Sequence, residues 1–160
     1  MTNARILDSA AMTTAAGHEL AAALCTGAVE RAVIYLRGEL GAGKTTFARG
    51  FLEGMGHTGR VPSPTYTLVE PYELAAWQVL HVDLYRLADP AEVDELGLTD
   101  LYGPQVAMLI EWPERGAGRV EPADVELMLD LEGEGRSLHV VALTTNGERL
   151  LGAAGWAPEA

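Results

Sequence analysis

Eight consecutive residues carry the clearest chemical signal in this sequence. Residues 38–45 follow the pattern G-x-x-x-x-G-K-[ST] of phosphate-binding loops. The glycines let the backbone approach an anion closely, and the N–H groups at the start of the following helix face it. In this pattern Lys44 reaches the terminal phosphates of a nucleotide and the Thr45 hydroxyl binds Mg²⁺. The sequence therefore predicts a polyphosphate site with a magnesium ion.

Two acidic residues, Asp83 and Glu111, each stand at the end of an apolar run that is typical of a buried strand. These runs, residues 78–83 and 106–113, suit the centre of a parallel sheet. Because ligands bind at the carboxyl ends of parallel strands, both acids should reach the crevice beside the glycine loop. One should bind Mg²⁺ with Thr45, and the other should position the attacking water. For either acid taken alone, a helix cap or an ordinary loop residue is the alternative.

The segment 61–67 combines two prolines with hydroxyl groups at Ser63, Thr65 and Thr67. Proline fixes φ and disfavours helix at the preceding residue, which predicts a rigid loop. The segment follows the helix after the glycine loop, where nucleotide hydrolases keep a switch-like segment that senses the terminal phosphate. A plain connection before a strand is the alternative.

Five further side chains lie near these motifs in the sequence or share their chemistry. His81 is expected to be a structural histidine rather than a ligand. Trp112 is expected to pack under the site with its indole N–H hydrogen-bonded. Arg86, Arg115 and Arg136 are candidates for phosphate contact, with surface ion pairing as the alternative for each.

The elements that must hold these residues alternate along the chain, which predicts an α/β fold. A strand over 32–36 feeds the glycine loop, and a helix over 46–52 follows it. The runs 124–131 and 137–143 predict an antiparallel C-terminal hairpin. Further strands are expected at 5–7, 66–70, 78–83 and 106–113, a turn at 71–76, and helices over 14–25, 90–97 and 148–151.

Composition limits the class of protein. The 160 residues predict a single domain, residues 1–160, with a proper core. A net charge of −12 argues against strong direct binding to nucleic acid, although a role in RNA metabolism through a partner protein stays possible. The single cysteine, Cys25, is expected to be buried and cannot form an internal disulfide. The sequence shows no signal peptide and no apolar run of membrane-spanning length, so a cytoplasmic protein without a membrane partner is expected.

Four stretches together resemble the TsaE (YjeE) family, the small ATPases of bacterial tRNA threonylcarbamoyladenosine biosynthesis. They are GELGAGKTTF at 38–47, SPTYTLVEPY at 63–72, HVDLYRL at 81–87 and EWPE at 111–114. The resemblance runs from about residue 10 to residue 136 and is weaker in the N-terminal helix and the tail.

The resemblance implies a three-layer P-loop NTPase-like fold with a central, mostly parallel sheet. It implies that Mg²⁺ is held by Thr45 and Glu111, and that Asp83 is the acid needed for hydrolysis. Lys44, Asp83 and Glu111 would then be the catalytic residues, and Ser63 and Thr65 would lie in the switch-like loop. The residues implied to bind ATP are Leu40, Gly41, Ala42, Gly43, Lys44, Thr45, Thr46 and Arg136.

The resemblance also implies how such a protein works. It hydrolyses ATP slowly and acts with the protein partners of the threonylcarbamoyl-transferase complex, and it does not transfer the group itself. That complex modifies the adenosine next to the anticodon in tRNAs reading codons that begin with A, so tRNA is expected to be contacted only indirectly.

Two alternative functions are also compatible with the glycine loop motif. A small-molecule kinase of similar size needs an arginine-rich lid, and the arginines here are scattered along the chain. A module that binds ATP and switches the assembly of a partner without hydrolysis has the same sequence features.

Overall fold

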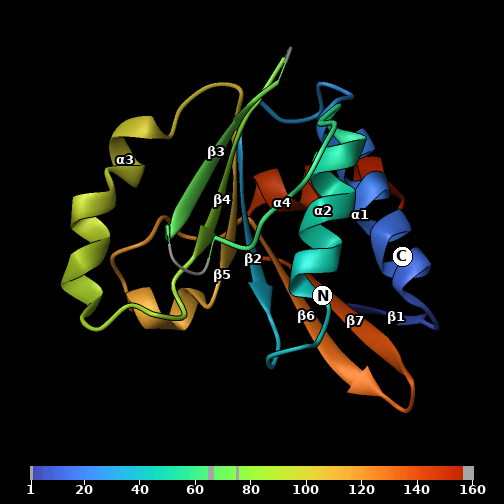
Figure 1. Ribbon diagram of the computed structural model, residues 1–160. Helices are drawn as coiled ribbons and strands as arrows, with labels where there is room; N and C mark the ends of the chain where they lie inside the picture. The colour runs from blue at the N-terminus through green and yellow to red at the C-terminus, as the bar shows by residue number, and fades with distance from the viewer. Residues whose placement is uncertain (1, 65–66, 75, 157–160) are drawn as a thin grey trace.

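The described part of the chain is built around a seven-stranded sheet (Figure 1). The computed structural model describes residues 2–64, 67–74 and 76–156. The strands are β1 (Thr2–Leu7), β2 (Ala32–Arg37), β3 (Val69–Glu73), β4 (Gln78–Asp83), β5 (Val106–Glu111), β6 (Val125–Glu132) and β7 (Gly135–Ala142). Their order in the sheet is β1-β7-β6-β2-β5-β4-β3. The four central strands β6, β2, β5 and β4 are parallel, and β3, β7 and β1 pair antiparallel at the two sides.

Helical segments cover both faces of this sheet, which gives three layers (Figure 1). One face carries α1 (Ala10–Leu24), α2 (Lys44–Gly54) and α4 (Thr145–Ala154). The other carries α3 (Leu98–Leu101) and the 3₁₀ helices η1 (Pro90–Leu96) and η2 (Pro113–Gly116). Among the described residues, no helix is long and apolar enough to cross a membrane.

The hydrophobic core has two parts, one on each side of the sheet. Successive residues of a strand point to opposite faces, so Ile34 of β2 packs with α1 and α2 while Val33 packs with η1 and α3. Strand β5 is buried along its whole length, as expected for a central parallel strand. The predicted α/β class, the mostly parallel centre and the C-terminal hairpin are confirmed.

The predicted strand over 66–70, of which residue 66 lies outside the described residues, and the turn predicted from Pro71 were wrong in position. Strand β3 is Val69–Glu73, and Pro71 lies inside it, opposite Leu80 of β4. Proline lacks the N–H that a central strand must donate, but β3 is an edge strand, where that loss is tolerated.

Three smaller expectations also differ from the structure. The C-terminal helix α4 begins earlier than predicted, because the Thr144 hydroxyl accepts a hydrogen bond from the Gly147 N–H at 3.0 Å and caps it. Residues 90–96 form a 3₁₀ helix rather than an α-helix. Cys25 is exposed, because it caps the C-terminal end of α1 and lies beyond the buried face of that helix.

Helices α1 and α2 lie side by side and touch through their backbones (Figure 1). A Cβ atom on Gly50 of α2 would overlap the Thr14 carbonyl of α1. A Cβ on Gly17 of α1 would in turn overlap the backbone of α2 at Phe47 and Phe51. Because α2 begins at the glycine loop, this contact fixes α1 relative to that loop.

The substitution Gly50→Ala is expected to lower the free energy of unfolding by about 2 kcal/mol, because the new methyl group forces the two backbones apart. Urea unfolding followed by circular dichroism measures this. The matched control is Gly152→Ala in α4, where a Cβ meets nothing within 4 Å. In that variant the free energy of unfolding should rise by about 0.5–1 kcal/mol, because alanine has the higher helix propensity. Equal losses of stability in both variants would contradict the backbone contact.

Candidate functional site

The loop of residues 38–43, here called the glycine loop, connects β2 to the N-terminus of α2. Gly38, Gly41 and Gly43 have positive φ angles of 148°, 79° and 107°, which residues with a Cβ rarely adopt. Gly43 immediately precedes α2 and has no side chain that could accept hydrogen bonds from the first N–H groups of this helix. These N–H groups and the positive end of the helix dipole suit an anion.

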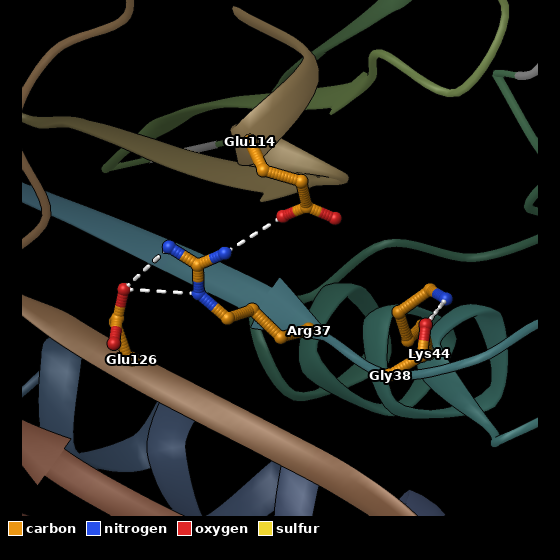
Figure 2. A network of polar contacts seen from close by, with 5 residues as sticks. All are labelled: Arg37, Gly38, Lys44, Glu114 and Glu126. Atoms are coloured by element: carbon orange, nitrogen blue, oxygen red, sulfur yellow. Dashed lines mark hydrogen bonds and ion pairs between the residues drawn. The ribbon is translucent and has the colours of Figure 1, made fainter. Parts of the chain in front are cut away.

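Lys44 is 5% exposed and reaches back over the glycine loop. Its Nζ donates to the Gly38 carbonyl (Figure 2) and to the Glu39 carbonyl at 3.2 Å. The ammonium group also lies 4.3 Å from the centre of the Trp112 ring. Burial lowers the pKa of Lys44, and the carboxylates of Glu111 and Asp83 partly oppose that shift. Lys44 is thus a partly desolvated cation with two acids nearby.

Asp83 and Glu111 end the neighbouring parallel strands β4 and β5 and stand opposite each other in the register. Their exposures are 4% and 3%, so both carboxylates are almost fully removed from bulk water. The Asp83 Oδ1 accepts a hydrogen bond from the Tyr85 N–H at 3.0 Å, which shapes the turn after β4. The predicted convergence of the two acids at one edge of the sheet is confirmed.

His81 contacts the predicted metal acid directly, which sequence reasoning missed. Its Nε2 lies 2.7 Å from the Glu111 Oε2, and the histidine is completely buried. Successive side chains of a strand point to opposite faces, so the two-residue spacing could have indicated that His81 and Asp83 share a face. The contact with Glu111 depends on β4 lying beside β5, which the sequence does not reveal.

These side chains surround a cavity of about 440 Å³, a size suited to a small-molecule ligand. It lies where the glycine loop, α2 and the ends of β4 and β5 meet. Its lining comprises Leu40, Gly41, Ala42, Gly43, Lys44, Thr45, Thr46, Ser63, Asp83, Tyr85, Arg86, Glu111 and Trp112. The structure therefore brings together the predicted loop, Ser63 and both acids, while Thr65 lies outside the described residues.

Arg136 stands apart from this cavity and holds the glycine loop from the other side. Its guanidinium group donates to the carbonyls of Ala42 (2.9 Å), Gly41 (3.0 Å) and Gly135 (2.9 Å). A second cavity of about 270 Å³ opens here and shares Gly43 and Thr46 with the first. Its lining comprises Leu7, Ser9, Ala10, Thr13, Gly43, Thr46, Glu134, Gly135 and Arg136.

The family model described as "Threonylcarbamoyl adenosine biosynthesis protein TsaE" matches residues 7–138 of this chain. The chain belongs to the TsaE family. The resemblance predicted from four motifs is thereby confirmed, and the family is one named for tRNA threonylcarbamoyladenosine biosynthesis.

Individual relatives agree with this assignment. The tRNA threonylcarbamoyladenosine biosynthesis protein TsaE of Haemophilus influenzae is 46% identical over 125 residues, which cover 78% of this chain and 79% of that protein. The protein of the same name from Rickettsia felis is 32% identical over 74% of this chain and 70% of its own. The crystal structure of YdiB from Bacillus subtilis superposes with a TM-score of 0.77, at 25% identity, over 97% of this chain and 95% of that one.

In this TsaE family member, an ion-pair network centred on Arg37 connects the start of the glycine loop to two neighbouring elements (Figure 2). Arg37, the last residue of β2, donates from Nε and Nη2 to the Glu126 Oε1 at 3.0 and 2.8 Å. Its Nη1 donates to the Glu114 Oε2 at 2.7 Å. Arg37 thus ties the start of the glycine loop to β6 and to η2, and Trp112 directly precedes η2.

Aromatic rings form the wall of the cavity next to Lys44. Trp112 has a left-handed backbone (φ 57°, ψ 48°), and its ring centre lies 5.0 Å from that of Tyr85. Arg115 is part of η2, and its guanidinium lies 5.2 Å from the Tyr85 ring centre. Trp112 therefore lines the cavity, the hydrogen bond expected for its indole N–H stays a prediction, and Arg115 packs on this wall.

The oxygen donors in the cavity suit Mg²⁺ that also binds a nucleotide. In the described part of the chain, no group of three or more His, Cys, Asp or Glu side chains is arranged to hold a metal. The cavity does offer the Thr45 hydroxyl and the carboxylates of Asp83 and Glu111. Magnesium keeps several waters and is usually held by one or two carboxylates plus substrate phosphates, so these residues fit it.

Proposed function

We propose that this protein is an ATPase that uses Mg²⁺ and assists threonylcarbamoyl modification of tRNA. One observation carries the proposal: Lys44, Thr45, Asp83 and Glu111, from three separate stretches of sequence, line one cavity at the N-terminus of α2. A loop cation, a helix-start hydroxyl and two strand-end carboxylates are the groups that phosphoryl transfer to water requires.

The two cavities suggest how the nucleotide lies. The phosphates occupy the first cavity. The N–H groups of the glycine loop donate hydrogen bonds to them, and the terminal phosphate faces Lys44 and the two acids. The second cavity takes the nucleoside, because it begins where the first ends, at Gly43 and Thr46. Arg136 borders that cavity, so it both braces the loop and faces the nucleoside.

Each group then has one task. Thr45 and Glu111 hold Mg²⁺, which supplies charge neutralisation at the phosphate oxygens when it is bound. Lys44 stabilises negative charge on the terminal phosphate. Asp83 positions the attacking water and accepts its proton. Ser63, which lines the same cavity, belongs to the segment that responds to the terminal phosphate.

The protein acts with the protein partners of the threonylcarbamoyl-transferase complex rather than on tRNA directly. Its net charge of −12 opposes direct binding to the phosphate backbone of RNA. ATP turnover is slow in isolation and rises when the partners bind, and the activity belongs to the cytoplasm, where tRNA is modified.

Reconstitution tests this proposal. Phosphate release from ATP is measured with and without the partner proteins, and threonylcarbamoyladenosine in the tRNA is quantified by mass spectrometry. We expect Mg²⁺-dependent release that the partners accelerate, together with modification that requires this protein. Transfer of the terminal phosphate to a small acceptor would support a kinase instead, and binding without turnover in any mixture would support an assembly module.

A further inference from the structure

We propose that His81 is a positioning residue that holds the Glu111 carboxylate in place for the metal ion. This inference rests on the proposed function, because it assigns Glu111 as a metal ligand. His81 itself contacts neither metal nor nucleotide in this proposal and acts only through Glu111.

The contact between the two residues runs diagonally across the β4–β5 pair. His81 stands opposite Leu109 in the register, two residues before Glu111, so both polar side chains point to the same face. The 2.7 Å separation of Nε2 and Oε2 is short for a nitrogen–oxygen hydrogen bond. With the histidine fully buried and Glu111 3% exposed, water does not compete with this bond.

The second ring nitrogen of His81 is unpaired, so within the described part of the chain the imidazole makes its one hydrogen bond to Glu111. A carboxylate only accepts hydrogen bonds, so the Nε2 of His81 carries the proton. Among the described residues, the buried Nδ1 has no hydrogen-bond partner. A histidine kept only for packing would be replaced at lower cost by an apolar side chain that leaves no buried nitrogen unpaired.

The bond also determines which oxygen faces the cation. With Oε2 held by His81, Oε1 of Glu111 remains to bind the metal from the cavity wall. Hydrogen bonds to metal-ligating carboxylates fix their orientation, and losing such a partner typically lowers metal affinity about 10- to 100-fold.

Three substitutions at His81 test the proposal. His81→Gln places an amide N–H near the position of Nε2, His81→Asn is one bond too short, and His81→Leu removes the donor. Manganese serves as the probe, because bound and free Mn²⁺ are distinguished by electron paramagnetic resonance. Its affinity is measured on the full chain with saturating ADP, and ADP affinity is measured separately in EDTA.

We expect His81→Asn and His81→Leu to lose about 10- to 100-fold in Mn²⁺ affinity, and His81→Gln to stay within about 3-fold of the wild type. ADP affinity in EDTA should be the same in all four proteins. Adding His81→Asn to Glu111→Gln should cause no further loss, because the two residues act as one unit.

Equal Mn²⁺ affinity in the Asn and Gln variants would overturn the positioning role, and this comparison remains decisive even if His81→Leu fails to fold. A wild-type chain that binds neither ADP nor Mn²⁺ would instead overturn the proposed function, so the two failures are distinguishable.

Discussion

Replacing Lys44 with alanine is expected to weaken ATP binding by about 100-fold or more. The ammonium group is buried beside the glycine loop, where its charge-assisted hydrogen bonds to phosphate are poorly screened by water. The same change leaves the Gly38 and Glu39 carbonyls without their donor, so the loop also loses part of its support. Isothermal titration with ATP in EDTA measures the effect without a contribution from the metal.

The matched control is Arg49→Ala. Arg49 lies on the same helix, carries the same charge and is exposed. We expect this variant to bind ATP within about 2-fold of the wild type, because exposed charges are well screened. Similar losses in both variants would mean that the overall charge of α2, rather than the Lys44 ammonium, attracts the nucleotide.

Glu111→Gln is expected to lower Mg²⁺-dependent ATP turnover by about 100-fold or more, while ATP binding in EDTA changes by less than about 3-fold. The substitution keeps the size of the side chain and an oxygen that can accept from His81, and it removes the charge that holds the metal. Phosphate release under partner-stimulated conditions measures turnover.

Two further variants sharpen this prediction. Asp83→Asn should lose turnover to a similar degree but keep its Mn²⁺ affinity, because Asp83 acts on the water. The exposed Glu95, on η1 and away from the cavity, provides the control Glu95→Gln, which should behave as the wild type. If Glu111→Gln hydrolysed ATP at the wild-type rate, Glu111 would not be the metal acid.

The parts of the site that follow from local sequence were predictable. The glycine pattern fixes where Lys44 and Thr45 lie relative to α2, because strand, loop and helix are consecutive. The apolar runs before Asp83 and Glu111 identify central parallel strands, whose carboxyl ends must meet at one edge.

The parts that depend on long-range neighbours were not predictable. The Arg136 guanidinium reaches the carbonyls of Gly41 and Ala42 only because the hairpin end of β7 is folded against the glycine loop. The His81–Glu111 bond likewise requires knowing which strands are adjacent. Pro71 suggested a turn because proline signals a strand boundary, and only the edge position of β3 makes it acceptable there.

The glycine-to-backbone contact of α1 with α2 has a mechanical consequence. Because the backbones of the two helices meet at Gly17 and Gly50 with no side chain between them, a displacement of α1 is transmitted directly to α2. The N-terminal ends of the two helices lie together, with Ser9 and Thr13 lining the second cavity and α2 beginning at Lys44. A protein that pushes on the outer side of α1 would therefore shift the walls of both cavities at once.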